Sequence, residues 1–297
     1  MRQSYDPVRR RLLLGAAALC AGPMLSRRAA SADFFKARPA TAQRPIEIGI
    51  LPILPTAALI AGHQPLRRHF EETFKRPVML WTAPDFHTFQ QRVLNGDFDF
   101  TIIGPGPGWQ AHADRKHQLV AVSQRMVHIY ILVAKDSPIK SVAELRGKTL
   151  ATIDPLTVTA QTTMLTLRGH KLQPGVEVQI RHEKTPFNAA QAVALGEVAA
   201  AGFPNIAYPN LPAEIRDKLR ILHESDGMPG VLFMVRPAAD IPKPEDFQAA
   251  LFRFAETEAG RGYVKEFNHD ALLKPDLKAL RILDRFVPET RRLMNLP

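Results

Sequence analysis

The sequence predicts an α/β protein of two lobes, each a wound β-sheet flanked by helices, joined by a two-strand hinge. Three observations support this prediction. From about Arg44 onward, short aliphatic or β-branched runs alternate with amphipathic stretches at helical spacing, which is typical of strand-helix-strand units. This series of elements occurs twice, and a tail of helices follows the second series.

The elements of the first lobe follow Arg44 in order. We expect strands at 46–50, 78–81 and 98–103, helices at 66–74 and 86–94, and a further helix from about Trp109. The second lobe repeats this pattern. We expect strands at 129–133, 149–153, 176–180 and 198–201, and helices at 142–145, 160–168 and 188–195. In both lobes a helix ends at Asn-Gly or Leu-Gly, an acid follows, and a strand begins, which indicates related topologies.

The tail begins with a strand at 231–235 and continues in helices. These are expected at 245–257, 262–267, 277–286 and 289–294, packed on the first lobe. The chain crosses between the lobes twice, near 123–126 and near 224–227, before this tail, which permits closure around a ligand. The predicted domains are therefore 44–124 with 226–297 as lobe I, and 125–225 as lobe II.

The N-terminal segment has the features of a removed export peptide. Arg9 to Arg11 precede an apolar run from Leu12 to Leu19, and Ala30-Ser31-Ala32 follows as a cleavage signal. We expect residues 1–32 to be removed and residues 33–43 to form a linker. The consecutive arginines are compatible with the twin-arginine route, and the Sec route stays open.

Composition excludes several kinds of site. The only cysteine, Cys20, lies in the export peptide, so the mature chain has no disulfide, cysteine nucleophile or thiolate metal ligand. The histidine pairs have no acid at a spacing that would complete a metal site, and neither G-x-S-x-G nor H-E-x-x-H occurs. We therefore expect no metal, no cofactor and no enzymatic activity.

Charge indicates the sign of a small ligand at most. The chain has a formal net charge of +10, and about half of this excess lies in the export peptide. The positive charge that remains on the mature chain is compatible with an anionic ligand. It is equally compatible with a charge that only keeps the protein in solution. The mature part has no basic block or basic-aromatic stripe, so nucleic acid is not an expected partner.

Ligands of wound sheets bind beyond the carboxyl ends of the strands, where loops lead into helix N-termini. Thr157 and Thr159 stand at such a place, and their hydroxyls beside unpaired helix N–H groups would suit an oxyanion. Asp154 or Thr157 could instead simply cap the helix. Candidates from the other loops are Thr56, Phe86 and Trp109, of which Phe86 and Trp109 could equally be core residues.

Six segments in a fixed order resemble the periplasmic phosphate/phosphite/phosphonate-binding proteins of ABC transporters, which have the type II periplasmic binding protein fold. These segments are Ile48-Gly49-Ile50-Leu51-Pro52, Ala83-Pro84-Asp85-Phe86, Asn95-Gly96-Asp97-Phe98-Asp99 leading to Ile103-Gly104-Pro105, the run from Ile131 to Ile139, Leu145-Arg146-Gly147-Lys148-Thr149, and Ile153-Asp154-Pro155. The similarity extends from about Arg44 to the C-terminus.

The resemblance implies roles for individual residues. Thr157 and Thr159 would hold the oxygens of a phosphonate, phosphite or phosphate, Phe86 would form a pocket wall, and His128 would donate to the anion. Ala199 stands where the family usually has an aspartate, which argues against an aminoalkylphosphonate. The implied protein is a periplasmic monomer that serves a membrane ABC permease, or alternatively a sensory partner of a histidine kinase. An oxyanion hydrolase would require a catalytic constellation that the sequence lacks.

Overall fold

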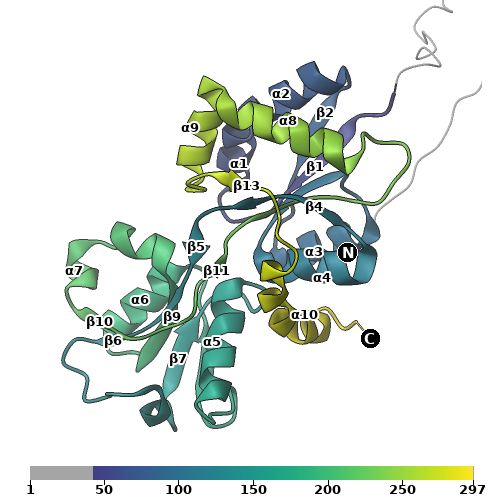
Figure 1. Ribbon diagram of the computed structural model, residues 1–297. Helices are drawn as coiled ribbons and strands as arrows, with labels where there is room; N and C mark the ends of the chain where they lie inside the picture. The colour runs from purple at the N-terminus through teal and green to yellow at the C-terminus, as the bar shows by residue number, and fades with distance from the viewer. Residues whose placement is uncertain (1–42, 297) are drawn as a thin grey trace, which may run out of the picture. The chain divides into compact units, whose positions relative to one another are not determined.

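The computed structural model describes residues 43–296, which form two large β-sheets, their helices and one small sheet (Figure 1). The predicted export peptide, and the predicted linker apart from Gln43, lie outside the described residues. In the part that is described, no helix has both the length and the apolar character needed to cross a bilayer.

The first large sheet has six strands in the order β13-β4-β12-β3-β1-β2. Strand β1 (Ile46–Ile50) pairs in parallel with β2 (Val78–Trp81) and β3 (Phe100–Ile103). Three antiparallel strands extend the sheet beyond β3: β12 (Leu232–Val235), β4 (Gln118–Ser123) and β13 (Leu272–Leu273). Helices cover both faces, and this burial explains why the central strands are continuous apolar runs instead of alternating ones.

Each face of this sheet has its own core. On one face lie α1 (Thr56–Gly62), α2 (Gln64–Phe74), α8 (Pro244–Glu256) and α9 (Glu258–Glu266), with Phe70 packed 5.2 Å from Phe100 and 5.6 Å from Phe247 between ring centroids. On the other face lie α3 (Phe86–Asn95), α4 (Pro105–Arg115), the 3₁₀ helix η3 (Ala279–Phe286) and α10 (Val287–Leu293).

The second large sheet has five strands in the order β10-β6-β9-β7-β8. The strands are β10 (Leu219–Glu224), β6 (Ile129–Ala134), β9 (Ala200–Pro204), β7 (Thr149–Thr152) and β8 (Gln179–His182). Around them lie η1 (Val142–Leu145), α5 (Val158–Gly169), α6 (Pro186–Ala194), η2 (Asn205–Asn210) and α7 (Ala213–Arg216). A Cβ at Gly202 in β9 would lie 2.1 Å from the Thr163 hydroxyl, so this glycine lets α5 pack directly on the sheet.

Two short strands lie where the chain passes from one sheet to the other. Strand β5 (Met126–Val127) follows β4, and β11 (Met228–Pro229) precedes β12. They pair in antiparallel register, Met228 opposite Val127, as the small sheet of Figure 1. The crossings lie where the sequence predicts a two-strand hinge.

A further contact joins the two lobes through the C-terminal segment. The tail packs on the first lobe, as expected, but α10 also contacts α5: the Gln161 side-chain amide donates to the Thr290 hydroxyl over 3.0 Å, with both residues buried. Leu156 shares a core with Leu280 and Leu283 of η3. Helix α5 is therefore held by its own sheet and by the C-terminal segment.

The structure differs from the sequence prediction at several places. Both sheets are mixed, because β12 returns late in the chain and inserts antiparallel beside β3, and β6 and β10 are antiparallel to their neighbours. Strands β4, β10 and β13 and helices α1 and α7 were not expected. The predicted strand at 176–180 lies instead at β8, because a turn through Gly175, at φ +79°, occupies its start. Helix α4 begins at Pro105, four residues before Trp109, because proline fits the first helical turn.

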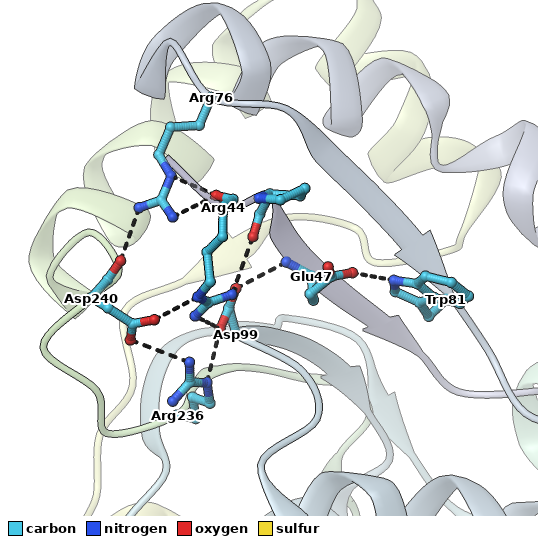
Figure 2. A network of polar contacts seen from close by, with 8 residues as sticks. Arg44, Glu47, Arg76, Trp81, Asp99, Arg236 and Asp240 are labelled. Carbon is cyan, nitrogen blue, oxygen red and sulfur yellow. Dashed lines mark hydrogen bonds and ion pairs between the residues drawn. The ribbon is translucent and has the colours of Figure 1, made fainter. Parts of the chain in front are cut away.

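A buried carboxylate fixes the start of β1 against the start of β3 (Figure 2). Asp99 is 1 % exposed and accepts from both terminal nitrogens of Arg44 at 2.8 Å, from Nε of Arg236 at 2.8 Å and from the backbone N–H of Glu47 at 3.0 Å. Arg44 also contacts Asp240, and these two carboxylates raise the pKa of its guanidinium. The network anchors β1, the first strand that the structure describes.

Candidate functional site

The loop from β7 into α5 presents unpaired hydrogen-bond donors. The hydroxyl of Thr157 donates to the Asp154 carbonyl at 2.7 Å and accepts from the Ala160 N–H at 3.2 Å, so it is a helix cap. The backbone N–H groups of Val158 and Thr159 have no acceptor within residues 43–296, as is usual in a first helical turn. The partial positive charge of the helix start makes these two groups suitable donors to an anion.

Thr159 adds a hydroxyl to these two amides. Its side chain is 3 % exposed, and its hydroxyl has no hydrogen-bond partner in the described part of the chain, although its carbonyl accepts from Thr163. Thr157, Val158 and Thr159 all line one cavity of about 340 Å³. The cavity side of α5 therefore carries three donors that a ligand could satisfy.

Residues of the first lobe form the opposite wall of this cavity. Leu51 and Ile53 belong to the loop after β1, and Phe86 begins α3 behind its cap, Asp85, whose carboxylate accepts from the Thr88 N–H at 2.7 Å. Gly104 and Pro105, at the start of α4, complete this wall. The cavity lies between the two large sheets, at the ends of strands from both.

Two cationic side chains that were not predicted from the sequence also line the cavity. Lys184 precedes Thr185, the cap of α6, and makes no hydrogen bond or ion pair with the described residues. Arg125 lies beside the β5 crossing and pairs with Asp270, while its Nε is buried without a partner. Lys184 lies one residue before the cap of α6, whereas Thr157 is itself the cap of α5, and no motif in the sequence marks an isolated cation in such a loop.

Of the six residues predicted for the site, Thr157, Thr159 and Phe86 line the cavity and the other three do not. Trp109 is 5 % exposed, packs in the core and donates through Nε1 to Asp284 at 2.7 Å. It lies away from the cavity because α4 starts at Pro105, which places Trp109 beyond the first helical turn.

His128 and Thr56 also lie outside the cavity lining. The backbone N–H of His128 donates to the side chain of Asn205 at 3.0 Å, and its Nδ1 lies 3.1 Å from the Ser225 carbonyl and 3.2 Å from the Glu224 carboxylate. His128 therefore connects the two crossings. Thr56 is the exposed first residue of α1, and the lining of the first loop ends at Ile53.

A second cavity, of about 470 Å³, lies against α8, α9 and β13. It is larger, but its lining comes from lobe I and the Arg125 crossing alone, and Arg125 and Arg261 already contact Asp270 and the Glu256 carbonyl. It contains no start of a helix comparable to α5. The cavity beside α5 is therefore the better candidate for a ligand.

The buried histidines form no metal site. Burial lowers the pKa of His63, His117 and His269 to about 4, so these rings are neutral at pH 7. Within residues 43–296, no group of three or more histidine, cysteine, aspartate or glutamate side chains is placed to hold a metal ion. The cavity beside α5 instead presents two backbone amides, a hydroxyl and two cations.

Comparisons with solved structures place the fold. XAC2383 from Xanthomonas citri, solved with a chloride ion, is 19% identical with a TM-score of 0.75, over 84% of this chain and 98% of that one. PhnD1 from Prochlorococcus marinus, solved with methylphosphonate, is 10% identical with a TM-score of 0.69, over 85% and 99%. A binding protein component of a Pseudomonas aeruginosa ABC phosphonate transporter is 18% identical with a TM-score of 0.65, over 84% and 87%.

No curated protein matches the sequence of this chain significantly. These structural similarities establish the two-lobed type II periplasmic binding protein fold that the sequence predicts. A family model described as ABC transporter, phosphonate, periplasmic substrate-binding protein matches residues 48–280, which is most of the chain. The chain therefore belongs to the phosphonate periplasmic substrate-binding proteins of ABC transporters.

Proposed function

We propose that this binding protein holds the oxyanion head of its ligand at the start of α5 and delivers the ligand to an ABC permease in the membrane. The observation that carries the proposal is the set of unsatisfied donors on one cavity wall: the N–H groups of Val158 and Thr159 and the hydroxyl of Thr159. Removing an anion from water is unfavourable unless such donors replace its hydration.

Thr157, Thr159 and Phe86 are the residues of the sequence prediction that this proposal keeps. Thr157 stabilises the helix start, because its hydroxyl donates to one backbone carbonyl and accepts from one backbone N–H. Thr159 donates to the anion, and Phe86 forms the facing wall. Lys184 and Arg125 supply positive charge that favours entry of an anion.

Closure between two bodies completes the proposal. We take residues 44–124 with 226–297 as one body and 125–225 as the other, with the β5–β11 pair as the hinge and α10 as an additional contact. Such a hinge absorbs the rotation in a few residues at element ends. The protein works in the periplasm as a monomer after export, and it binds its ligand without chemical conversion. The sensory alternative is not favoured, since the family is one of transport proteins.

Isothermal titration calorimetry with methylphosphonate tests the anion site. The double variant Thr157→Val, Thr159→Val should lose about 1.5 to 3 kcal/mol of binding free energy, the contribution of a hydrogen bond to a charged group. Thr166→Val, further along the same helix and outside the cavity lining, is the control and should bind like the unsubstituted protein. Equal affinity of the double variant and the control would remove the start of α5 from the site.

A further inference from the structure

The walls of the cavity beside α5 are mostly apolar. Leu51, Ile53 and Phe86 line it from the first lobe, and Leu156, Pro204 and Ile206 line it from the second. Pockets for organic ligands combine walls of this kind with a few polar groups that fix the orientation. The three donors of α5 lie at one part of the cavity, and although polar residues such as Ser123 and Asn268 also line it, apolar side chains form most of its surface.

The size of the cavity supports the same conclusion. Its volume of about 340 Å³ falls within the range of roughly 300 to 1,000 Å³ for pockets that enclose small organic molecules. A bare tetrahedral oxyanion would occupy only a small part of this space. The rest would hold water against Phe86 and Ile206, and an apolar group of a ligand would displace that water favourably.

The charged residues of the cavity indicate what the ligand lacks. Two lining residues are cations, Arg125 and Lys184, and the only carboxylate among the lining residues is Asp154. Asp154 already accepts from the Leu156 N–H at 2.8 Å through one oxygen, as part of the turn that starts α5. An ammonium group in this cavity would lose its hydration without gaining a free carboxylate as a counter-ion. It would also lie near two cations.

We infer that the ligand is an organic oxyanion whose anionic head carries an apolar, amine-free body of several carbon atoms. This inference rests on the proposed function, because it assigns the head to the donors of α5. The body lies between Phe86 and Leu51 on one side and Ile206 on the other. Inorganic phosphate and aminoalkylphosphonates are then poor ligands, the first for lack of a body and the second for its ammonium group.

A series of alkylphosphonates tests the apolar body. Calorimetry with methyl-, ethyl-, propyl- and butylphosphonate should give affinities that rise about fourfold with each added methylene, which corresponds to about 0.8 kcal/mol for a buried CH₂. Ile206→Ala should reduce this increment per methylene. An affinity that stays constant or falls along the series would overturn the inference while the proposed anion site stands.

A matched pair of ligands tests the absence of an amine. Propylphosphonate and 2-aminoethylphosphonate have nearly the same shape, with a methyl group in one where the other has an ammonium. We expect the propyl compound to bind at least tenfold tighter. Tighter binding of the amine, lost in Asp154→Asn, would show that Asp154 is a counter-ion and would overturn the inference. If no member of either set binds, the proposed function fails and the inference fails with it.

Discussion

Thr157 and Thr159 lie two residues apart, yet their hydroxyl groups face different partners. The Thr157 hydroxyl donates to the Asp154 carbonyl and accepts from the Ala160 N–H, whereas the Thr159 hydroxyl makes no hydrogen bond with the described residues. The two single variants should therefore separate stability from binding. Thr157→Val should lower the free energy of unfolding by about 1 kcal/mol, the usual loss for an N-cap. Thr159→Val should leave unfolding nearly unchanged and weaken methylphosphonate binding.

Urea denaturation and calorimetry on the two single variants measure this separation. A stability loss in Thr159→Val as large as that in Thr157→Val would mean that Thr159 has a structural hydrogen bond and not a ligand-directed one. The residue types at the start of α5 were predictable from the sequence, because a threonine before a helix identifies a cap or an anion site. The division of roles between the two threonines was not predictable, since it depends on which hydroxyl donates to the Asp154 carbonyl in the folded turn.

Asp99 is the residue on which the anchoring of β1 depends most. It is 1 % exposed and bound by two arginines, and removing one partner of a buried ion pair destabilises proteins by about 3 to 5 kcal/mol. Because Arg44 is partly exposed, we expect the lower end, about 3 kcal/mol, for Asp99→Asn in urea denaturation. Arg281→Gln breaks an exposed pair with Asp284 and should change stability by less than about 1 kcal/mol. Similar losses in both variants would contradict the anchoring role.

At the level of elements, α5 is the helix that connects the site to the rest of the fold. Its contact with α10 through Gln161 and Thr290 is buried. Thr290→Val would leave the Gln161 amide without that partner, and a buried unsatisfied polar group costs about 1 to 3 kcal/mol. Gln161→Leu in the Thr290→Val background should recover part of the loss. A double-mutant cycle by urea denaturation should give a coupling energy of at least about 0.5 kcal/mol, and perfect additivity would argue against the contact.

The elements show which parts of the fold follow from local sequence. Strands β1 and β2 have their predicted bounds, and β6, α3 and α8 differ from the prediction by one residue at one or both ends, because their apolar periodicity is regular and their ends carry clear caps or turns. Strand β4 was missed, because the run from Gln118 to Ser123 follows a helix whose start was misplaced. The Gly-Pro repeat from Gly104 to Gly108 suggested a loop, whereas its prolines fit the first turn of α4.

The same helix explains why Trp109 lies away from the cavity. A Cβ at Gly108, one residue before Trp109, would lie 2.8 Å from Ile103 and 3.0 Å from Leu232. Gly108 therefore permits packing of α4 on the sheet. Lys184 and Arg125 were not predicted for the opposite reason: an isolated cation on an exposed loop carries no sequence signal until the fold brings it to the cavity.

For the molecule as a whole, buried neutral histidines predict the response to acid. His63, His117 and His269 have pKa values lowered to about 4 in the folded protein, against about 6.5 when the chain is unfolded. Between these values the unfolded chain binds more protons, so stability is present above about pH 6.5 and is lost as the pH falls toward 4. The free energy of unfolding should therefore fall by several kcal/mol from pH 7 to pH 4.5.

Substitution of one of these histidines tests the assignment. His117→Leu removes a buried ring whose two nitrogens have no partner, and it should reduce the loss of stability between pH 7 and pH 4.5 by about 2 kcal/mol. The exposed His170 provides the matched variant, His170→Gln, which should keep the full pH dependence. Parallel pH profiles for both variants would assign the acid sensitivity to other groups.

The central claim of this account is that two lobes enclose an organic oxyanion at the first turn of α5. A crystal structure of the protein with propylphosphonate bound tests this claim most directly. We predict phosphonate oxygens within about 2.7 to 3.2 Å of the N–H groups of Val158 and Thr159, with the propyl group against Phe86 and Ile206. A ligand bound in the cavity beside α8 and α9, or between the lobes but away from these two amides, would contradict the claim.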